Sequence, residues 1–242
     1  MTGTDTEDPE VSPADRARRR RVFGRLELVA TILIAVATVL TAWSAFQSTK
    51  WGGVQANSYA AASAARTESG KAGALANTQV TIDVTIWADW LAALADELRL
   101  DPNASRGPDG TYQADPEQLS GVLFDRFRDE FKPAVEAWLA QRPLENPDAD
   151  ATPFVVPEYR LAERERESRL TVRAESRAAE ARDANQTGDN YVLTTVLFAS
   201  VLFFAGISSK FESLRNHSIM IIMAVLILIA GVTILATYPI EI

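Results

Sequence analysis

Two acids, Asp83 and Asp89, are the residues of this sequence whose surroundings favour chemistry. They stand beside Trp87 and Trp90 in an otherwise apolar stretch. A carboxyl group buried among apolar side chains has a raised pKa and can donate or accept a proton near neutral pH. Because unpaired acids are rarely buried, the alternative is that both carboxylates simply face water. A buried carboxylate is therefore the one catalytic candidate that the sequence offers.

No other arrangement typical of catalysis or cofactor binding is present in the sequence. The chain has no cysteine and one histidine, His217, so thiolate metal sites, cysteine nucleophiles and histidine pairs are excluded. It contains neither a phosphate-binding loop nor a Gly-x-Ser-x-Gly motif. The net charge of −8 argues against nucleic-acid binding, which requires a cationic surface. We therefore expect no cofactor, no metal ion, no nucleic-acid partner and no enzymatic activity.

Three apolar stretches organise the elements that must position these residues. Residues 28–46 contain no charge, follow a run of arginines and can cross about 30 Å of hydrocarbon as a helix. Two further apolar stretches near the C-terminus are joined by a short link that carries Lys210 and Arg215. The sequence predicts an all-α membrane protein with three transmembrane helices, over residues 26–48, 191–209 and 218–240, and an extracytoplasmic helical hairpin domain between spans 1 and 2.

The distribution of charge predicts the orientation of these spans. Cytoplasmic segments of membrane proteins are enriched in Lys and Arg. We therefore expect a disordered cytoplasmic tail over residues 1–21, a cytoplasmic link over residues 210–217 and an extracytoplasmic domain over residues 51–189. That domain contains fifteen Lys and Arg against twenty-four Asp and Glu, and its net charge of −9 suits an outer surface.

The extracytoplasmic domain is predicted to contain three helices, over about residues 54–100, 116–141 and 158–187. The first is rich in alanine and lacks proline. Asp115 is expected to cap the second, with Pro116 in its first position, and Pro133 should kink or divide it. The third is charged, but alanines line one of its sides. We expect that side to pack against the first helix as an antiparallel pair.

Small residues recur at steps of three and four on one face of the helix predicted for residues 26–48. Helices in lipid associate through close packing of such faces, because lipid offers no hydrophobic driving force. The candidate helix interface consists of Thr31, Ala35, Thr38, Ala42 and Ala45. The alternative is a path for water or ions in an oligomer, lined by the hydroxyl groups of Thr31, Thr38, Thr41, Ser44 and Ser48.

Aromatic and basic residues mark the expected outer boundary of the membrane. Trp and Tyr are enriched at the level of the lipid headgroups, and a lysine there can extend its amine to water. The candidate membrane-interface anchors are Trp43, Lys50, Trp51, Tyr191 and Tyr238.

Recognisable motifs are spread over most of residues 42–209. They are Ala42-Trp43 with Gln47, Trp51, Gly53 and Gln55; Ile82-Asp83-Val84; Pro157-Glu158-Tyr159-Arg160-Leu161; and Asn190-Tyr191-Val192-Leu193 followed by Leu197-Phe198-Ala199 and Phe203-Phe204-Ala205-Gly206. Together these motifs resemble a family of uncharacterised bacterial three-span inner-membrane proteins that has no known activity. The resemblance implies the three-span layout and a bacterial inner membrane, and it implies no ligand or catalytic residue.

These observations favour a binding function. The first interpretation is a membrane-anchored structural or interaction module that associates with copies of itself or presents its outer helical domain to envelope partners. Its expected partners are membrane lipid, further copies of the chain or another envelope protein. The alternative is an oligomeric channel or transport subunit whose Thr and Ser face lines the path. A third possibility is an enzyme that acts on the outer face through a buried carboxylate.

Overall fold

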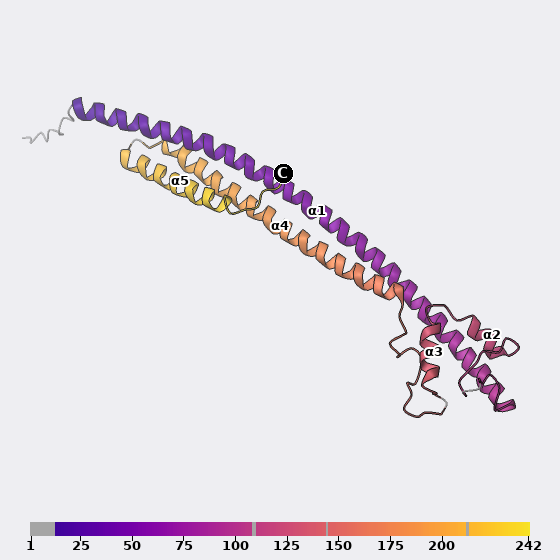
Figure 1. The fold of residues 1–242 in the computed structure, drawn as a ribbon. Coiled ribbons are helices and arrows are strands. Elements are labelled where there is room, and N and C mark those ends of the chain that lie inside the picture. The colour runs from indigo at the N-terminus through magenta and orange to yellow at the C-terminus, as the bar shows by residue number, and fades with distance from the viewer. Residues whose placement is uncertain (1–12, 108–109, 144, 212) are drawn as a thin grey trace, which may run out of the picture. The chain divides into compact units, whose positions relative to one another are not determined.

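The computed structural model describes residues 13–107, 110–143, 145–211 and 213–242, and Figure 1 shows its fold. Over these residues the chain forms helices α1 (Pro13–Leu100), α2 (Leu119–Asp125), α3 (Lys132–Ala140), α4 (Ala162–Ser208) and α5 (Leu214–Leu235). Apart from an isolated bridge between Arg106 and Tyr112, the described residues contain no β-structure. The prediction of an all-α fold is confirmed.

Three of the helices, α1, α4 and α5, contain stretches that are long and apolar enough to cross a membrane. Their apolar side chains are widely exposed: Leu28, Val39 and Leu193 show 60%, 68% and 62% of their surface. A protein in water rarely leaves so much contiguous apolar surface uncovered, whereas lipid covers it. Each of the three predicted spans therefore falls in a helix that suits a membrane.

The chain divides into two compact units, which we describe separately. The anchor unit comprises Met1–Ala60 and Arg177–Ile242, and the aromatic unit comprises Ala61–Ser176. The anchor unit contains the predicted spans, and the aromatic unit contains Asp83 and Asp89.

In the anchor unit, α1, α4 and α5 pack around a core of apolar side chains (Figure 1). Its buried members are Ala30, Leu33, Ala37, Phe198, Val201, Ala205, Ile221 and Ala224. Gly231 lets α5 approach α4, because a Cβ atom there would lie 2.8 Å from the ring of Phe198. A buried hydrogen bond from Thr194 to Ser44, at 3.0 Å, and an exposed one from Gln55 to Asn185, at 2.8 Å, show that α1 and α4 run antiparallel here.

The candidate helix interface does not form the contact between helices within the chain. Its five residues, Thr31, Ala35, Thr38, Ala42 and Ala45, are exposed in the single chain. The internal contact uses the opposite side of α1, where Leu33 and Ala37 meet the apolar side chains of α4 and α5. The hydroxyl groups of Thr31 and Thr38 donate to the backbone carbonyls of Glu27 and Ile34, at 3.0 and 2.8 Å.

Several predicted boundaries differ from the structure. Helix α1 begins at Pro13, so residues 13–21 of the predicted tail are helical, and residues 1–12 lie outside the described residues. The helices predicted for residues 26–48 and 54–100 are one helix, and so are those predicted for residues 158–187 and 191–209. A membrane boundary changes the side chains but breaks no backbone hydrogen bond, so without proline a helix continues through it. Helix α5 ends at Leu235, short of the predicted residue 240.

The helix predicted for residues 116–141 is instead two short helices, α2 and α3. Asp115 caps a turn before α2, accepting a hydrogen bond from the backbone N–H of Glu117 at 2.9 Å. Pro133 lies in the first turn of α3, where its missing N–H costs nothing. Gly121 in α2 packs directly on the backbone of Asp115, where a Cβ atom would overlap it.

The aromatic unit has its own core around Trp90. Trp90 and Phe131 are completely buried, and so is Val135. The segment between α3 and α4 is irregular, but Phe154, Val156 and Tyr159 pack onto this core. The predicted burial of the alanine side of α4 is confirmed at Ala174 in this unit and at Ala178, Ala181 and Ala184 in the anchor unit.

Candidate functional site

Asp83 on α1 is completely buried and forms the polar centre of the aromatic unit. The guanidinium group of Arg128, between α2 and α3, donates to both of its carboxylate oxygens: Nε to Oδ1 at 2.9 Å and Nη2 to Oδ2 at 2.8 Å. The hydroxyl group of Tyr159 donates to Oδ2 at 3.2 Å. We call these three residues the Asp83 clamp. It joins three segments of chain that are remote in sequence.

The positive charge of Arg128 neutralises the negative charge of Asp83 in the clamp. The hydrogen bond to Asp83 raises the pKa of the Arg128 guanidinium, so this group stays charged. Burial and then the negative charge of Asp83 raise the pKa of the Tyr159 hydroxyl, so it remains a hydrogen-bond donor. Glu130 accepts a further hydrogen bond from Arg128 Nη1 at 3.0 Å. A paired carboxylate engaged by three donors holds the segments together and is poorly placed to exchange protons with a substrate.

The structure separates the two predicted acids. Asp83 is buried in the clamp, whereas Asp89 is exposed. Sequence reasoning missed Arg128 and Tyr159 as partners of Asp83. A signal was available, because Ile82-Asp83-Val84 and the Pro157 to Leu161 motif each contribute one member of the clamp.

A second polar cluster lies at the N-terminal end of α2. Glu97 on α1 accepts hydrogen bonds from the backbone N–H of Ser120 at 2.8 Å and from the Ser120 hydroxyl at 2.6 Å. The hydroxyl of Ser105 also donates to Glu97, at 3.1 Å. Burial raises the pKa of the nearby Tyr112 hydroxyl, which donates to Ser120 at 3.3 Å. Glu97 therefore satisfies an N–H group at the start of α2 in place of a capping side chain.

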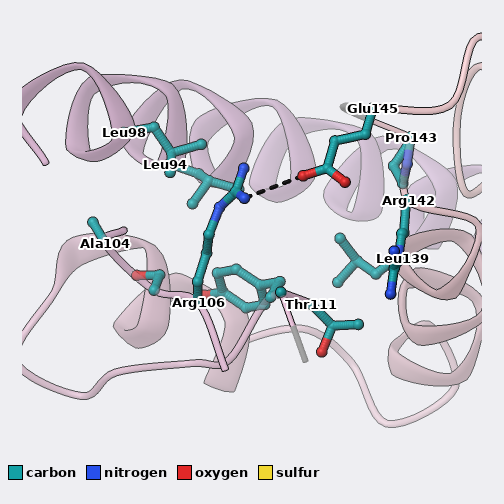
Figure 2. Close-up of a pocket in the computed structure, with 12 residues that line it drawn as sticks. Leu94, Leu98, Ala104, Arg106, Thr111, Leu139, Arg142, Pro143 and Glu145 are labelled. Atoms are coloured by element: carbon teal, nitrogen blue, oxygen red, sulfur yellow. Dashed lines mark hydrogen bonds and ion pairs between the residues drawn. The ribbon is translucent and has the colours of Figure 1, made fainter. Parts of the chain in front are cut away.

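A small pocket lies beside this cluster, and Figure 2 shows the residues that line it. Leu94 and Leu98 of α1 form its apolar side with Tyr112 and Leu139. Arg106 reaches across to Glu145, with 3.1 Å between nitrogen and oxygen, as the dashed line in Figure 2 marks. The volume of about 40 Å³ holds a few waters or a small side chain, and sites for drug-sized ligands are several times larger.

Three residues that line this pocket have a positive φ angle, which is uncommon for residues other than glycine. Among the described residues, positive φ angles occur at Ser105 (53°), Arg142 (54°) and Gly110 (79°), and all three residues line the pocket. Arg142 follows Gln141, the C-cap residue of α3, a place where this conformation is common.

The candidate membrane anchors meet at the segment that follows α5. The indole N–H of Trp51 and the hydroxyl of Tyr191 both donate to the carbonyl oxygen of Pro239, at 3.2 and 3.0 Å. Tyr238 packs edge-on against Tyr191, with 5.3 Å between ring centroids. Trp43 is exposed, and Lys50 is half-buried. Three of the five predicted anchors are therefore brought together.

A buried amide completes this region. Gln47 is fully buried on α1 and pairs with the backbone of Glu241, its Nε2 donating at 3.0 Å and its Oε1 accepting at 2.9 Å. The predictions did not include Gln47 as an anchor, although it belongs to one of the motifs that carry the family resemblance. The segment that follows α5 is thus held by polar contacts to α1 and α4.

At the other end of the anchor unit, His217 is buried against Phe23, and neither of its ring nitrogens has a hydrogen-bond partner among the described residues. The described residues also contain no group of three or more His, Asp or Glu that could hold a metal ion. Comparison of the chain with known protein families, curated proteins and solved structures finds no match.

Proposed function

We propose that this chain is an integral membrane protein that acts by binding: α1, α4 and α5 anchor it, and its aromatic unit is a rigid module for protein partners. The proposal includes the bacterial inner membrane, a cytoplasmic N-terminus and an extracytoplasmic helical hairpin over residues 51–189. The resemblance of the motifs at residues 42–209 to a bacterial inner-membrane family and the placement of Lys and Arg support that location and orientation.

The observation that carries the proposal is the saturation of the Asp83 clamp. The buried carboxylate of Asp83, the best catalytic candidate in the sequence, is occupied by Arg128 and Tyr159. The pocket lined by Leu94, Tyr112 and Leu139 is too small for a drug-sized ligand. The Asp83 clamp joins three segments of the unit and holds the surface that they form in place, and a fixed surface loses little entropy when a partner docks.

The orientation can be tested by labelling single cysteines, because the chain contains none. Ser168→Cys and Ser213→Cys are closely matched substitutions at exposed positions, one on α4 and one immediately before α5. In intact cells we expect a membrane-impermeant maleimide to label the variant at residue 168 and to label that at residue 213 only after permeabilisation. The reverse pattern, or labelling of both in intact cells, would contradict the proposed topology.

Self-association can be tested on the candidate helix interface, which the single chain leaves exposed. We expect Ala35→Leu or Ala42→Leu to weaken assembly by about tenfold or more, because a larger side chain prevents the close approach of two helices. The mass of the complex in nanodiscs measures the effect. Val36→Leu adds bulk to a different side of α1 and serves as the control. Unchanged mass in both alanine variants would exclude this face as the interface.

A further inference from the structure

The start of α1 and the turn between α4 and α5 form a strongly cationic end of the anchor unit. Residues 16–29 and 209–217 contain eight Lys and Arg and two Glu, a net charge of +6 in a chain whose total is −8. The ring of Phe23 meets that of His217 edge-on, with 5.5 Å between centroids, so the two segments lie side by side. Positive charge is therefore concentrated where the apolar stretches of α1 and α5 begin.

The described cations at this end have no carboxylate partner among the described residues. Every ion pair of the described chain lies between Glu68 and Glu180. The basic residues without one at this end are Arg18, Arg20, Arg21, Arg25, Lys210 and Arg215. Glu27, which lies on α1 beside them, is exposed and forms no ion pair within the described chain either. Such a concentration of like charge repels itself unless an anion neutralises it.

Two of these arginines border a shallow, open hollow of about 480 Å³ along one face of α1, which we call the groove. Its lining residues are Arg21, Gly24, Arg25, Leu28 and Val29. Steps of three and four residues place all five on one face of the helix. Apart from the chain neighbours of Gly24 and the backbone of its own helix, no atom of the described residues lies within 4 Å of the position that a Cβ atom of Gly24 would take, so a larger side chain has room there.

We infer that this groove binds an anionic phospholipid, with the headgroup phosphate between Arg21 and Arg25 and an acyl chain along Leu28 and Val29. The two arginines are one helical turn apart, so both guanidinium groups can donate hydrogen bonds to the same phosphate. Leu28 and Val29 are 60% and 36% exposed and lie further along α1 in the apolar stretch, where hydrocarbon would begin. The inference rests on the proposal that residues 28–46 cross a membrane.

The experiment is a lipid titration of the full chain in detergent, followed by native mass spectrometry, with phosphatidylglycerol and phosphatidylcholine as probes. We expect the first phosphatidylglycerol to bind about tenfold or more tightly than the first phosphatidylcholine. The double variant Arg21→Gln, Arg25→Gln is expected to lose roughly 30-fold in affinity for phosphatidylglycerol. The control Arg173→Gln, Arg182→Gln makes the same change in charge at exposed positions of α4 and should leave the affinity unchanged.

Gly24→Leu separates the shape of the groove from its charge, because it fills the space and keeps every arginine. We expect it to weaken phosphatidylglycerol binding by about tenfold, through the loss of room beside the phosphate. Equal affinity for the two lipids, an equal loss in the α4 control or full binding by Gly24→Leu would each overturn the inference. The cysteine labelling above tests orientation independently of lipid charge, so the two proposals can fail separately.

Discussion

Replacing Arg128 with alanine is expected to destabilise the aromatic unit by about 3–5 kcal/mol, because it leaves the buried carboxylate of Asp83 without its cation. The side chain of Asp83 is completely buried, so water cannot replace the lost hydrogen bonds without opening the core. Tyr159 alone would then contact the carboxylate. Hydrogen exchange of residues 61–176, measured on the full chain in nanodiscs, should become roughly 150- to 5,000-fold faster in the slowest amides.

Two comparisons isolate the effect of the clamp. Arg126→Ala removes an exposed arginine two residues away that forms no ion pair within the described chain, and it should change protection little. The double variant Asp83→Leu, Arg128→Leu removes both charges and should recover much of the loss, because apolar replacement of a buried pair is often close to neutral. If Arg128→Ala exchanges as slowly as the original chain, the clamp does not stabilise the unit.

Replacing Trp90 with alanine is expected to lower the stability of the aromatic unit by about 3–5 kcal/mol, because it leaves a cavity at the centre of the aromatic core. The indole of Trp90 is completely buried and meets Tyr112, Phe127 and Trp138 edge-on, at centroid distances of 5.2, 6.0 and 6.4 Å. We expect the collapse of this cluster to expose residues 61–176 to limited proteolysis in the nanodisc-embedded chain.

Trp43→Ala is the matched control for Trp90. Trp43 is 40% exposed and belongs to the anchor unit, so its loss creates no cavity in the aromatic core. The variant should keep the proteolytic resistance of residues 61–176. If Trp90→Ala keeps it too, the aromatic cluster is not what holds this unit together.

Much of the fold follows from local patterns in the sequence. The uncharged length of residues 28–46 and the position of Trp90 in an apolar helical run are readable without long-range information. The start of α2, at Leu119 and not at Pro116, is harder to predict from the sequence. It is fixed by Glu97, which accepts a hydrogen bond from the backbone of Ser120 from a different helix, and by the tight contact between Gly121 and Asp115. Contacts of this kind leave no periodic signal.

Only part of the candidate site, the buried acid Asp83, could be predicted from the sequence. Asp83 and Trp90 are seven residues apart and share a helix face, whereas Asp89 lies six residues from Asp83 and points elsewhere. Helical phase could therefore have distinguished the buried acid from the exposed one. The partners of Asp83 could not be found in this way, because Arg128 and Tyr159 lie 45 and 76 residues further along the chain.

The pairing of Gln47 with Glu241 can form only late in synthesis of the chain. The two residues are 194 positions apart, so at 5–20 residues per second a ribosome needs roughly 10–40 seconds to add the second after the first. Throughout that interval the carboxamide of Gln47 has no backbone partner on the segment after α5. Until the segment after α5 is made, the amide of Gln47, which lies just beyond the uncharged stretch of residues 28–46, must find its hydrogen bonds elsewhere.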